Sequence, residues 1–297
     1  MTTERAAGAV TVAHLLEELA RELNMAGIAE PFSEAREIVS ALYDAPRFWP
    51  LLNGAVAVDS ETLARARRAV ERRSRGAPLA YAVGRANFRH LTLDVDERVL
   101  IPRPETEQLV DLVLEVCARD GAPGVAMDVG TGSGCLLATL LCELEGARGT
   151  GTDISQAALA VARGNASRLG VSQRSSWLIA DGLETVPGTF HMLISNPPYV
   201  RTGEIAHLEP EVRNFDPAAA LDGGADGLAL YRAWAPWLRR LVPDGWIVLE
   251  VGYDQADAVA SIIASGMGQA VAEAHIYRDV AGTRRCVAMR ARAGTHA

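Results

Sequence analysis

The sequence predicts an α/β fold: a doubly wound, mostly parallel sheet, preceded by a small N-terminal helical domain and a β-hairpin linker. Three observations predict it. From about residue 105 onward, helical and strand patterns alternate, which is typical of a parallel sheet with helices on both faces. Residues 1–75 contain only helical patterns, and residues 76–104 contain short alternating apolar runs. A chain of 297 residues is long enough for two domains.

The helical domain is expected to cover residues 1–75. Its first helix carries an apolar stripe at helical spacing, made of Val12, Leu15, Leu16, Leu19 and Leu23, with Thr11 as a suitable N-cap. A second helix follows Pro31, with Ser33 as its cap, and a third begins near Ser60. The third carries an arginine cluster: Arg65, Arg67, Arg68, Arg72, Arg73 and Arg75. We interpret this cluster as a solvated helix face, with a local basic patch as the alternative.

Residues 76–104 are expected to form the β-hairpin linker, with a turn at residues 94–97. The domain that follows is expected to span residues 105–292. Its predicted helices are 106–118, 135–144, 156–169 and 228–241, and its predicted strands are 125–129, 148–153, 177–180, 191–195 and 246–251. No element is assigned beyond residue 251.

Composition narrows the class of protein. The net charge of −8 and the pI of about 5.3 count against a free-standing enzyme of DNA or RNA, because phosphate contacts normally require a basic surface. The four cysteines form no CxxC pair and no spacing typical of metal ligands, so we expect reduced thiols and no metal site. Residues 1–10 lack a secretory pattern, and no apolar run reaches the roughly 18 residues of a membrane span. We therefore expect a cytoplasmic protein. A monomer is expected as well, although no motif bears on it.

A glycine-rich loop follows the predicted strand 125–129 and opens a helix. It consists of Gly130, Thr131, Gly132, Ser133 and Gly134. Its GxGxG spacing lacks the last glycine of a dinucleotide fingerprint, so it favours a nucleoside without a phosphate over a pyrophosphate. Asp153 ends the next strand, where a carboxylate can bind both ribose hydroxyls. A purely structural turn is the alternative.

A second acidic position, Asp181 followed by Gly182, ends the strand after that. The Asp181 carboxylate could accept a hydrogen bond from an adenine amino group. A turn aspartate is the alternative interpretation.

The tetrapeptide Asn196, Pro197, Pro198 and Tyr199 directly follows the predicted strand 191–195. Two prolines fix the backbone and leave carbonyl groups unpaired, so a rigid turn is the simplest interpretation. The catalytic interpretation also explains the outer residues. The Asn196 side-chain oxygen and the Pro197 carbonyl could accept both N–H groups of a planar NH2, and Tyr199 could pack on its flat face. For transfer of a methyl group to that nitrogen, such positioning suffices if the methyl donor is a strong electrophile, as a sulfonium is.

These motifs together resemble the class I, Rossmann-like methyltransferases that modify planar NH2 groups. Two further segments resemble the peptide chain release factor glutamine N5-methyltransferase family in particular: residues 100–107, with the sequence LIPRPETE, and residues 220–228, with the sequence ALDGGADGL. Residues 75–81 and the helical N-terminal domain resemble the same family. The resemblance covers nearly the whole chain.

The resemblance implies S-adenosyl-L-methionine as cofactor, with the residues from Arg103 to Thr106 lining its site. It also implies class I release factors as protein partners, methylated on the glutamine of the Gly-Gly-Gln loop. It implies no direct binding of nucleic acid and no membrane. The chain departs from the family pattern at Asp216, where relatives have Glu, and at Gly182, where relatives often have a bulky residue. Two alternatives keep the catalytic loop but change the target: an N6-adenine nucleic-acid methyltransferase and a glutamine methyltransferase of a ribosomal protein. A binding module without turnover is a third.

Overall fold

The computed structural model describes residues 10–122, 124–279 and 281–292, and the chain divides into two compact units. The first unit runs to Arg85 and includes Pro210–Phe215, and the second contains Ala86–Glu209 and Asp216–Ala297. The exact limits of the three predicted domains stay predictions. The prediction of no secretory pattern concerns residues that lie almost entirely outside the described part.

The first unit is helical. Its elements are α1 (Val12–Met25), α2 (Pro31–Leu42), α3 (Trp49–Leu52), α4 (Ser60–Ser74), α5 (Leu79–Val83) and α9 (Pro210–Phe215). The predicted stripe of α1 is buried, and Thr11 caps this helix by accepting from the backbone of His14. The predicted cap of α2 was wrong: Glu30 occupies that position, and Ser33 instead accepts from Arg36 and Arg47.

Several arginines of the predicted cluster pair with acidic side chains of the same unit. Arg73 binds Glu34 through two nitrogens, at 2.6 and 3.0 Å, and Glu211 at 2.7 Å. Arg67 pairs with Glu18. Arg67 keeps an exposed side chain, as expected of a solvated helix face, whereas the Arg73 side chain is mostly buried between its acidic partners.

A two-stranded hairpin, β1 (Arg85–Phe88) and β2 (Leu91–Asp94), follows α5. Its turn lies at Arg89 and His90, so the predicted turn at residues 94–97 was wrong. Arg89 adopts a φ of 54°, a left-handed conformation that is uncommon for an arginine and that the sequence does not predict. Glu107 compensates by accepting from the Arg89 backbone N–H at 2.8 Å.

The second unit is built on a seven-stranded sheet, with the strand order β5-β4-β3-β6-β7-β9-β8. Its strands are β3 (Val125–Val129), β4 (Arg148–Asp153), β5 (Ser175–Ile179), β6 (Met192–Ser195), β7 (Gly245–Glu250), β8 (Val271–Arg278) and β9 (Arg284–Ala291). The first five strands of the order are parallel to one another, and β9 pairs antiparallel with both of its neighbours, β7 and β8. The predicted fold class is therefore confirmed.

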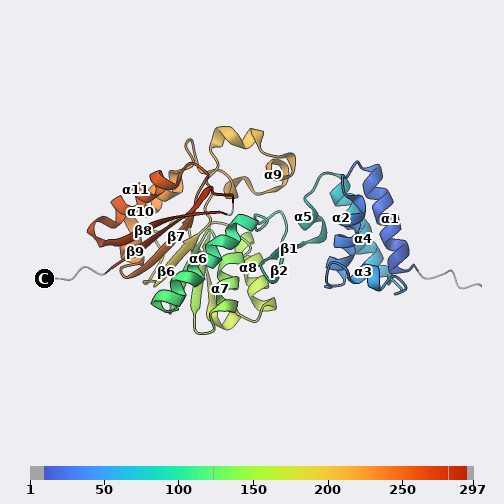
Figure 1. Ribbon diagram of the computed structural model, residues 1–297, viewed down its shortest axis with the longest axis horizontal. Helices are drawn as coiled ribbons and strands as arrows, with labels where there is room; N and C mark the ends of the chain where they lie inside the picture. The colour runs from blue at the N-terminus through green and yellow to red at the C-terminus, as the bar shows by residue number, and fades with distance from the viewer. Residues whose placement is uncertain (1–9, 123, 280, 293–297) are drawn as a thin grey trace, which may run out of the picture. The chain divides into compact units, whose positions relative to one another are not determined.

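Helices cover both faces of this sheet (Figure 1). They are α6 (Pro104–Asp120), α7 (Cys135–Glu143), α8 (Gln156–Arg168), α10 (Ala229–Leu241) and α11 (Ala256–Met267). Helices α10 and α11 share the main apolar core with β3, β6 and β7, through residues such as Trp234, Ile263 and Leu193. Helices α7 and α8 share a smaller core through Leu137 and Ala166.

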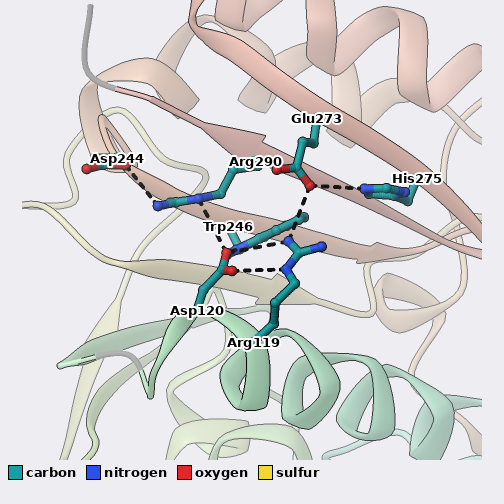
Figure 2. Close-up of polar contacts among 7 residues, drawn as sticks. All are labelled: Arg119, Asp120, Asp244, Trp246, Glu273, His275 and Arg290. Carbon is teal, nitrogen blue, oxygen red and sulfur yellow. Dashed lines mark hydrogen bonds and ion pairs between the residues drawn. The ribbon is translucent and has the colours of Figure 1, made fainter.

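Polar side chains fasten the C-terminal end of α6 to the strands β7, β8 and β9 (Figure 2). Trp246 donates its indole N–H to Asp120 at 2.9 Å, and Arg119 stacks 5.0 Å from the centre of the Trp246 ring. Arg119 also bonds to Asp120 and Glu273, and Arg290 pairs with Asp120. We call these residues the outer network of α6.

Candidate active site

The candidate site lies where the parallel strands end. Asp153 is the last residue of β4, Asn196 directly follows β6, and Glu250 is the last residue of β7. The loop that begins at Gly130 follows β3, and Asp181 comes shortly after β5. Because these five strands run in the same direction, their carboxyl ends share one edge of the sheet, which is where ligands of such sheets bind.

A cavity of about 570 Å³ opens at this edge, within the second unit. Most of the predicted site residues line it: Arg103, Gly130, Thr131, Gly132, Ser133, Asp153, Asp181, Gly182, Asn196 and Pro198. Three do not. Gly134 is the N-cap of α7, Pro197 is buried, and Tyr199 turns its hydroxyl toward Glu250. The structure thus brings the two predicted motifs together around one space, while the individual roles stay predictions.

The glycine-rich loop presents bare backbone to the cavity. Gly130 and Gly132 have φ angles of 68° and 53°, which favour glycine. No heavy atom lies within 4 Å of the point where a Cβ would stand on either residue. A side chain there would occupy the cavity, so glycine leaves room for a ligand to approach the backbone.

The Asp153 carboxylate is held beside this loop by two backbone groups. Its Oδ2 accepts from the N–H of Gly132 at 2.9 Å, and its Oδ1 accepts from the N–H of Ser155 at 2.8 Å. Each oxygen keeps a further lone pair, so the carboxylate can accept from two neighbouring hydroxyls. An open glycine loop beside a fixed carboxylate fits the ribose of a nucleoside cofactor.

Asp128 lies beneath the same loop and was not among the predicted site residues. It is buried and accepts from the Thr131 hydroxyl at 2.6 Å. Burial raises the pKa of Asp128 to about 7, although the bond from Thr131 opposes the rise. Its position at the end of β3, two residues before Gly130, could have indicated it from the sequence.

The Asn196–Tyr199 loop is bonded to a buried carboxylate. The Asn196 amide donates from Nδ2 to the Thr106 hydroxyl at 2.9 Å, and Thr106 donates to Glu250 at 2.8 Å. The Tyr199 hydroxyl donates to the other oxygen of Glu250 at 3.1 Å. We call Asn196, Thr106, Glu250 and Tyr199 the inner network of α6, because Thr106 lies in the first turn of that helix.

Glu250 is fully buried, and burial raises its pKa to about 7. The bonds from Thr106 and Tyr199 lower the pKa and so limit the rise. The sequence reasoning missed this residue, which is the only acid in an otherwise apolar predicted strand. Its place at the carboxyl end of that strand is the signal that could have found it.

The segment 220–228 lies against the backbone of the Asn196–Tyr199 loop. A Cβ on Gly223 would stand 2.8 Å from the Pro198 carbonyl oxygen and 2.8 Å from the Tyr199 Cα, so only glycine fits. Gln255 holds the same loop from another side by donating to the Tyr199 carbonyl at 2.9 Å. The loop is thus fixed by its surroundings as well as by its prolines.

Asp216, the departure from the family pattern, is buried and forms an ion pair with Arg103, a residue of the cavity wall. The shorter acid therefore still reaches this arginine. Gly182, the second departure, lines the cavity with no side chain of its own.

Two features are absent from the part of the chain that the structure describes. The described residues contain no group of three or more His, Cys, Asp or Glu side chains that could hold a metal ion. In the same part of the chain, no helix is long and apolar enough to cross a membrane.

Comparison with known proteins supports the assignment made from the motifs. Residues 107–210 match the family Methyltransferase small domain, and residues 14–84 match the PrmC N-terminal domain. The release factor glutamine methyltransferase of Rhodospirillum rubrum is 37% identical over 286 residues, which are 96% of this chain and 86% of that protein. The enzyme of the same name from Caulobacter vibrioides is 40% identical over 242 residues, or 81% of this chain and 83% of that protein.

A solved structure agrees on the fold. The catalytic domain of hMettl16, in complex with the MAT2A 3'UTR hairpin 6, has a TM-score of 0.55 at 16% identity and covers 80% of this chain and 85% of its own. At that identity the likeness concerns the fold alone. The sequence relatives, which are similar along almost the full length, decide the family: this chain belongs to the release factor glutamine methyltransferases.

Proposed function

We propose that this chain transfers the methyl group of S-adenosyl-L-methionine to the side-chain amide nitrogen of the glutamine in the Gly-Gly-Gln loop of class I peptide chain release factors. The observation that carries the proposal is the single cavity that joins the Gly130–Gly134 loop and Asp153 to Asn196. Membership of the family supports the choice of target. We further expect the enzyme to act in the cytoplasm as a monomer.

The chain's own residues would position the reactants. The bound cofactor supplies an electrophilic methyl group on a sulfonium. Asp153 would bind its ribose, the glycine loop would lie against it, and Asp181 would accept from its adenine. Asn196 Oδ1 and the Pro197 carbonyl would accept the two N–H groups of the target amide and so direct its nitrogen at the methyl carbon.

The reaction needs little beyond this alignment. When bound, the cofactor would supply the methyl group and keep the electrons of its S–CH3 bond as S-adenosyl-L-homocysteine, while the amide nitrogen would lose one proton. Holding two reactants in line can lower the activation barrier by about 7–11 kcal/mol. Because an N-alkylated amide cation is a strong acid, water or a carbonyl oxygen suffices as the final proton acceptor.

The direct test is methyl transfer from radiolabelled S-adenosyl-L-methionine to a purified class I release factor. Label should enter the wild-type release factor and not a variant with alanine in place of the loop glutamine. Parallel reactions with DNA, RNA and ribosomal proteins test the alternative targets. Transfer to one of those and none to the release factor would replace the proposed substrate. Cofactor binding without any transfer would indicate a binding module.

Two variants of the enzyme separate the roles within the site. Asn196→Ala should lower kcat by about 100- to 1,000-fold, as for other lost groups that stabilise a reacting amide or carbonyl, with cofactor affinity nearly unchanged. Asp153→Ala should weaken cofactor binding by about 10- to 100-fold, since it removes charge-assisted hydrogen bonds. Calorimetric titration with S-adenosyl-L-homocysteine and single-turnover transfer rates measure the two effects. Normal turnover in Asn196→Ala would refute the assigned role of the loop.

A further inference from the structure

Asn196 can serve the proposed reaction in only one of its two amide orientations. Its oxygen and its nitrogen occupy nearly equivalent positions, and a rotation of the amide exchanges an acceptor for a donor. A target NH2 group offers only donors in the plane of the amide. The site therefore works only when Asn196 directs Oδ1, and not Nδ2, toward the target, and something in the protein must enforce this choice.

Thr106 supplies the first part of the constraint. A hydroxyl has one hydrogen and two lone pairs, and the hydrogen of Thr106 is donated to Glu250 at 2.8 Å. Toward Asn196 the hydroxyl can then only accept, which fits the bond of 2.9 Å from Asn196 Nδ2. With its nitrogen engaged by Thr106, Asn196 keeps Oδ1 as an acceptor. Thr106 and Asn196 both line the cavity.

Glu250 supplies the second part. An ionised carboxylate can only accept, so it forces both of its hydroxyl partners, Thr106 and Tyr199, to donate. Glu250 forms no ion pair within the described part of the chain. Burial of a carboxylate without a cation in contact is costly, and such groups are typical of functional sites rather than of structural cores.

We propose that Glu250 and Thr106 are positioning residues, which fix the Asn196 amide with its oxygen toward the methyl-accepting nitrogen. The carboxylate sets the direction of the hydroxyl, and the hydroxyl sets the orientation of the amide. The site thereby selects a target group that donates N–H. This inference rests on the proposed function, because it concerns the same reaction.

The bonds that run from Glu250 through Thr106 to Asn196, which we call the relay, depend on the charge of Glu250 and therefore on pH. The titratable and charged groups around this carboxyl are Glu105 on α6, Cys135 on α7, Tyr199 in the loop, Tyr231 on α10, and Arg285 and Cys286 on β9. Protonation of Glu250 would turn one acceptor oxygen into a donor, so either Thr106 or Tyr199 would lose its acceptor. The rate of methyl transfer should therefore fall as the pH drops below about 7.

The main test replaces Thr106 by valine, which has nearly the same shape and lacks the hydroxyl. Thr106→Val should lower kcat by about 100-fold, the scale expected for a misplaced reactive group, with cofactor affinity within about threefold of wild type. Thr106→Ser should restore most of the rate. The matched control is Thr139→Val in α7, which also removes a buried hydroxyl, one that bonds only to the Cys135 carbonyl. That control should turn over normally.

A second variant tests the carboxylate. Glu250→Gln keeps the size but offers one donor and one acceptor, so kcat should fall by about 10-fold and its dependence on pH between 6 and 8 should flatten. A Thr106→Val enzyme as fast as the Thr139→Val control would overturn the relay, as would a Glu250→Gln enzyme with the wild-type pH profile.

The same experiments distinguish this inference from the proposed function. If the wild-type enzyme transfers no methyl group to the release factor, the proposed function fails and the relay fails with it. If the wild type is active and only the predicted losses are missing, the relay alone fails. Tight binding of S-adenosyl-L-homocysteine by each variant shows that its site is folded.

Discussion

Helix α6 carries a polar network at each end, and the two differ in exposure and in charge. The outer network at Arg119 and Asp120 is open to solvent and pairs every carboxylate with a cation (Figure 2). In the inner network, Thr106 and Glu250 are buried, and the one carboxylate, Glu250, accepts from two hydroxyls. The C-terminal end of α6 is thus held by ion pairs, whereas its first turn bonds to a carboxylate that has no cation in contact among the described residues.

The difference indicates what each network does. In water an exposed ion pair contributes little, because both charges are already well solvated. Arg119 and Asp120 therefore hold α6 on the sheet mainly through Trp246, by the indole hydrogen bond to Asp120 and the packing of Arg119 on the indole ring. A buried, unpaired carboxylate destabilises the fold unless it is protonated. Its presence at the edge of the cavity points to a chemical use that outweighs the cost.

The largest expected effect concerns Glu250 and stability. Its pKa is about 7 in the folded protein and near 4.5 in its ordinary state. Between these values the folded chain keeps a proton that the unfolded chain has lost, so this group's contribution to stability falls as the pH rises from 4.5 to 7. Above pH 7 the penalty is complete, on the order of 3 kcal/mol.

Glu250→Gln removes this titration. Relative to wild type, the variant should gain about 2–3 kcal/mol of stability between pH 5 and pH 8, seen as a larger free energy of unfolding. Urea unfolding at both pH values measures this difference in stability. The titration of Asp128, whose pKa is also about 7, contributes equally to both proteins and cancels in the difference. A variant that gains stability at pH 8 and loses activity would show that the carboxylate is kept for function. A constant difference between the two proteins at both pH values would show that Glu250 does not titrate in this range.

The sequence predicted the parallel part of the sheet and the two motifs that meet at its edge. Strand and helix periodicities from residue 105 to 251 carried that information, because each buried strand and each amphipathic helix repeats its own pattern. The end of the chain was missed. Strand β8 alternates between half-buried and exposed residues at the edge of the sheet, with Ala and charged residues among them, which is a weak strand signal.

The inner network could not be predicted from local sequence. Thr106 and Glu250 are 144 positions apart, and nothing near either residue indicates the other. Resemblance placed Thr106 near the cofactor, but its bond to Asn196 depends on the packing of α6 beside β7. Tyr199 was predicted to pack on the target amide, a role that stays a prediction, whereas its bond to Glu250 was unforeseen. Motifs thus identified residues of the cavity wall, and only the fold identified what holds them.

A smaller effect is expected at the outer network from Trp246→Phe. The substitution removes the indole N–H that bonds to Asp120 and leaves a smaller ring in a buried position. The lost bond and the imperfect packing should cost about 1–2 kcal/mol of unfolding free energy, with kcat per folded molecule unchanged. Thermal unfolding and transfer rates measured on the same sample separate the two. A loss of activity without a loss of stability would show that the outer end of α6 also tunes the site.

The smallest effect is expected from Arg119→Gln. This side chain is half exposed and pairs with Asp120 and Glu273, both reachable by water and salt. Glutamine keeps a polar chain of similar reach but loses the charge and most of the stacking on Trp246. The melting temperature should fall by no more than about 2 °C in dilute buffer, since exposed pairs contribute little.

Salt sharpens this last comparison. At 0.5 M NaCl, charges at the surface are screened within a few ångströms, so the difference between Arg119→Gln and wild type should nearly vanish. The difference between Glu250→Gln and wild type should persist, because salt does not enter the buried network. Melting curves of the three proteins at low and high salt provide the measurement. If high salt erased both differences alike, Glu250 would be accessible to solvent ions. The carboxylate would then not be shielded from solvent, and its assignment to a buried network at the first turn of α6 would be wrong.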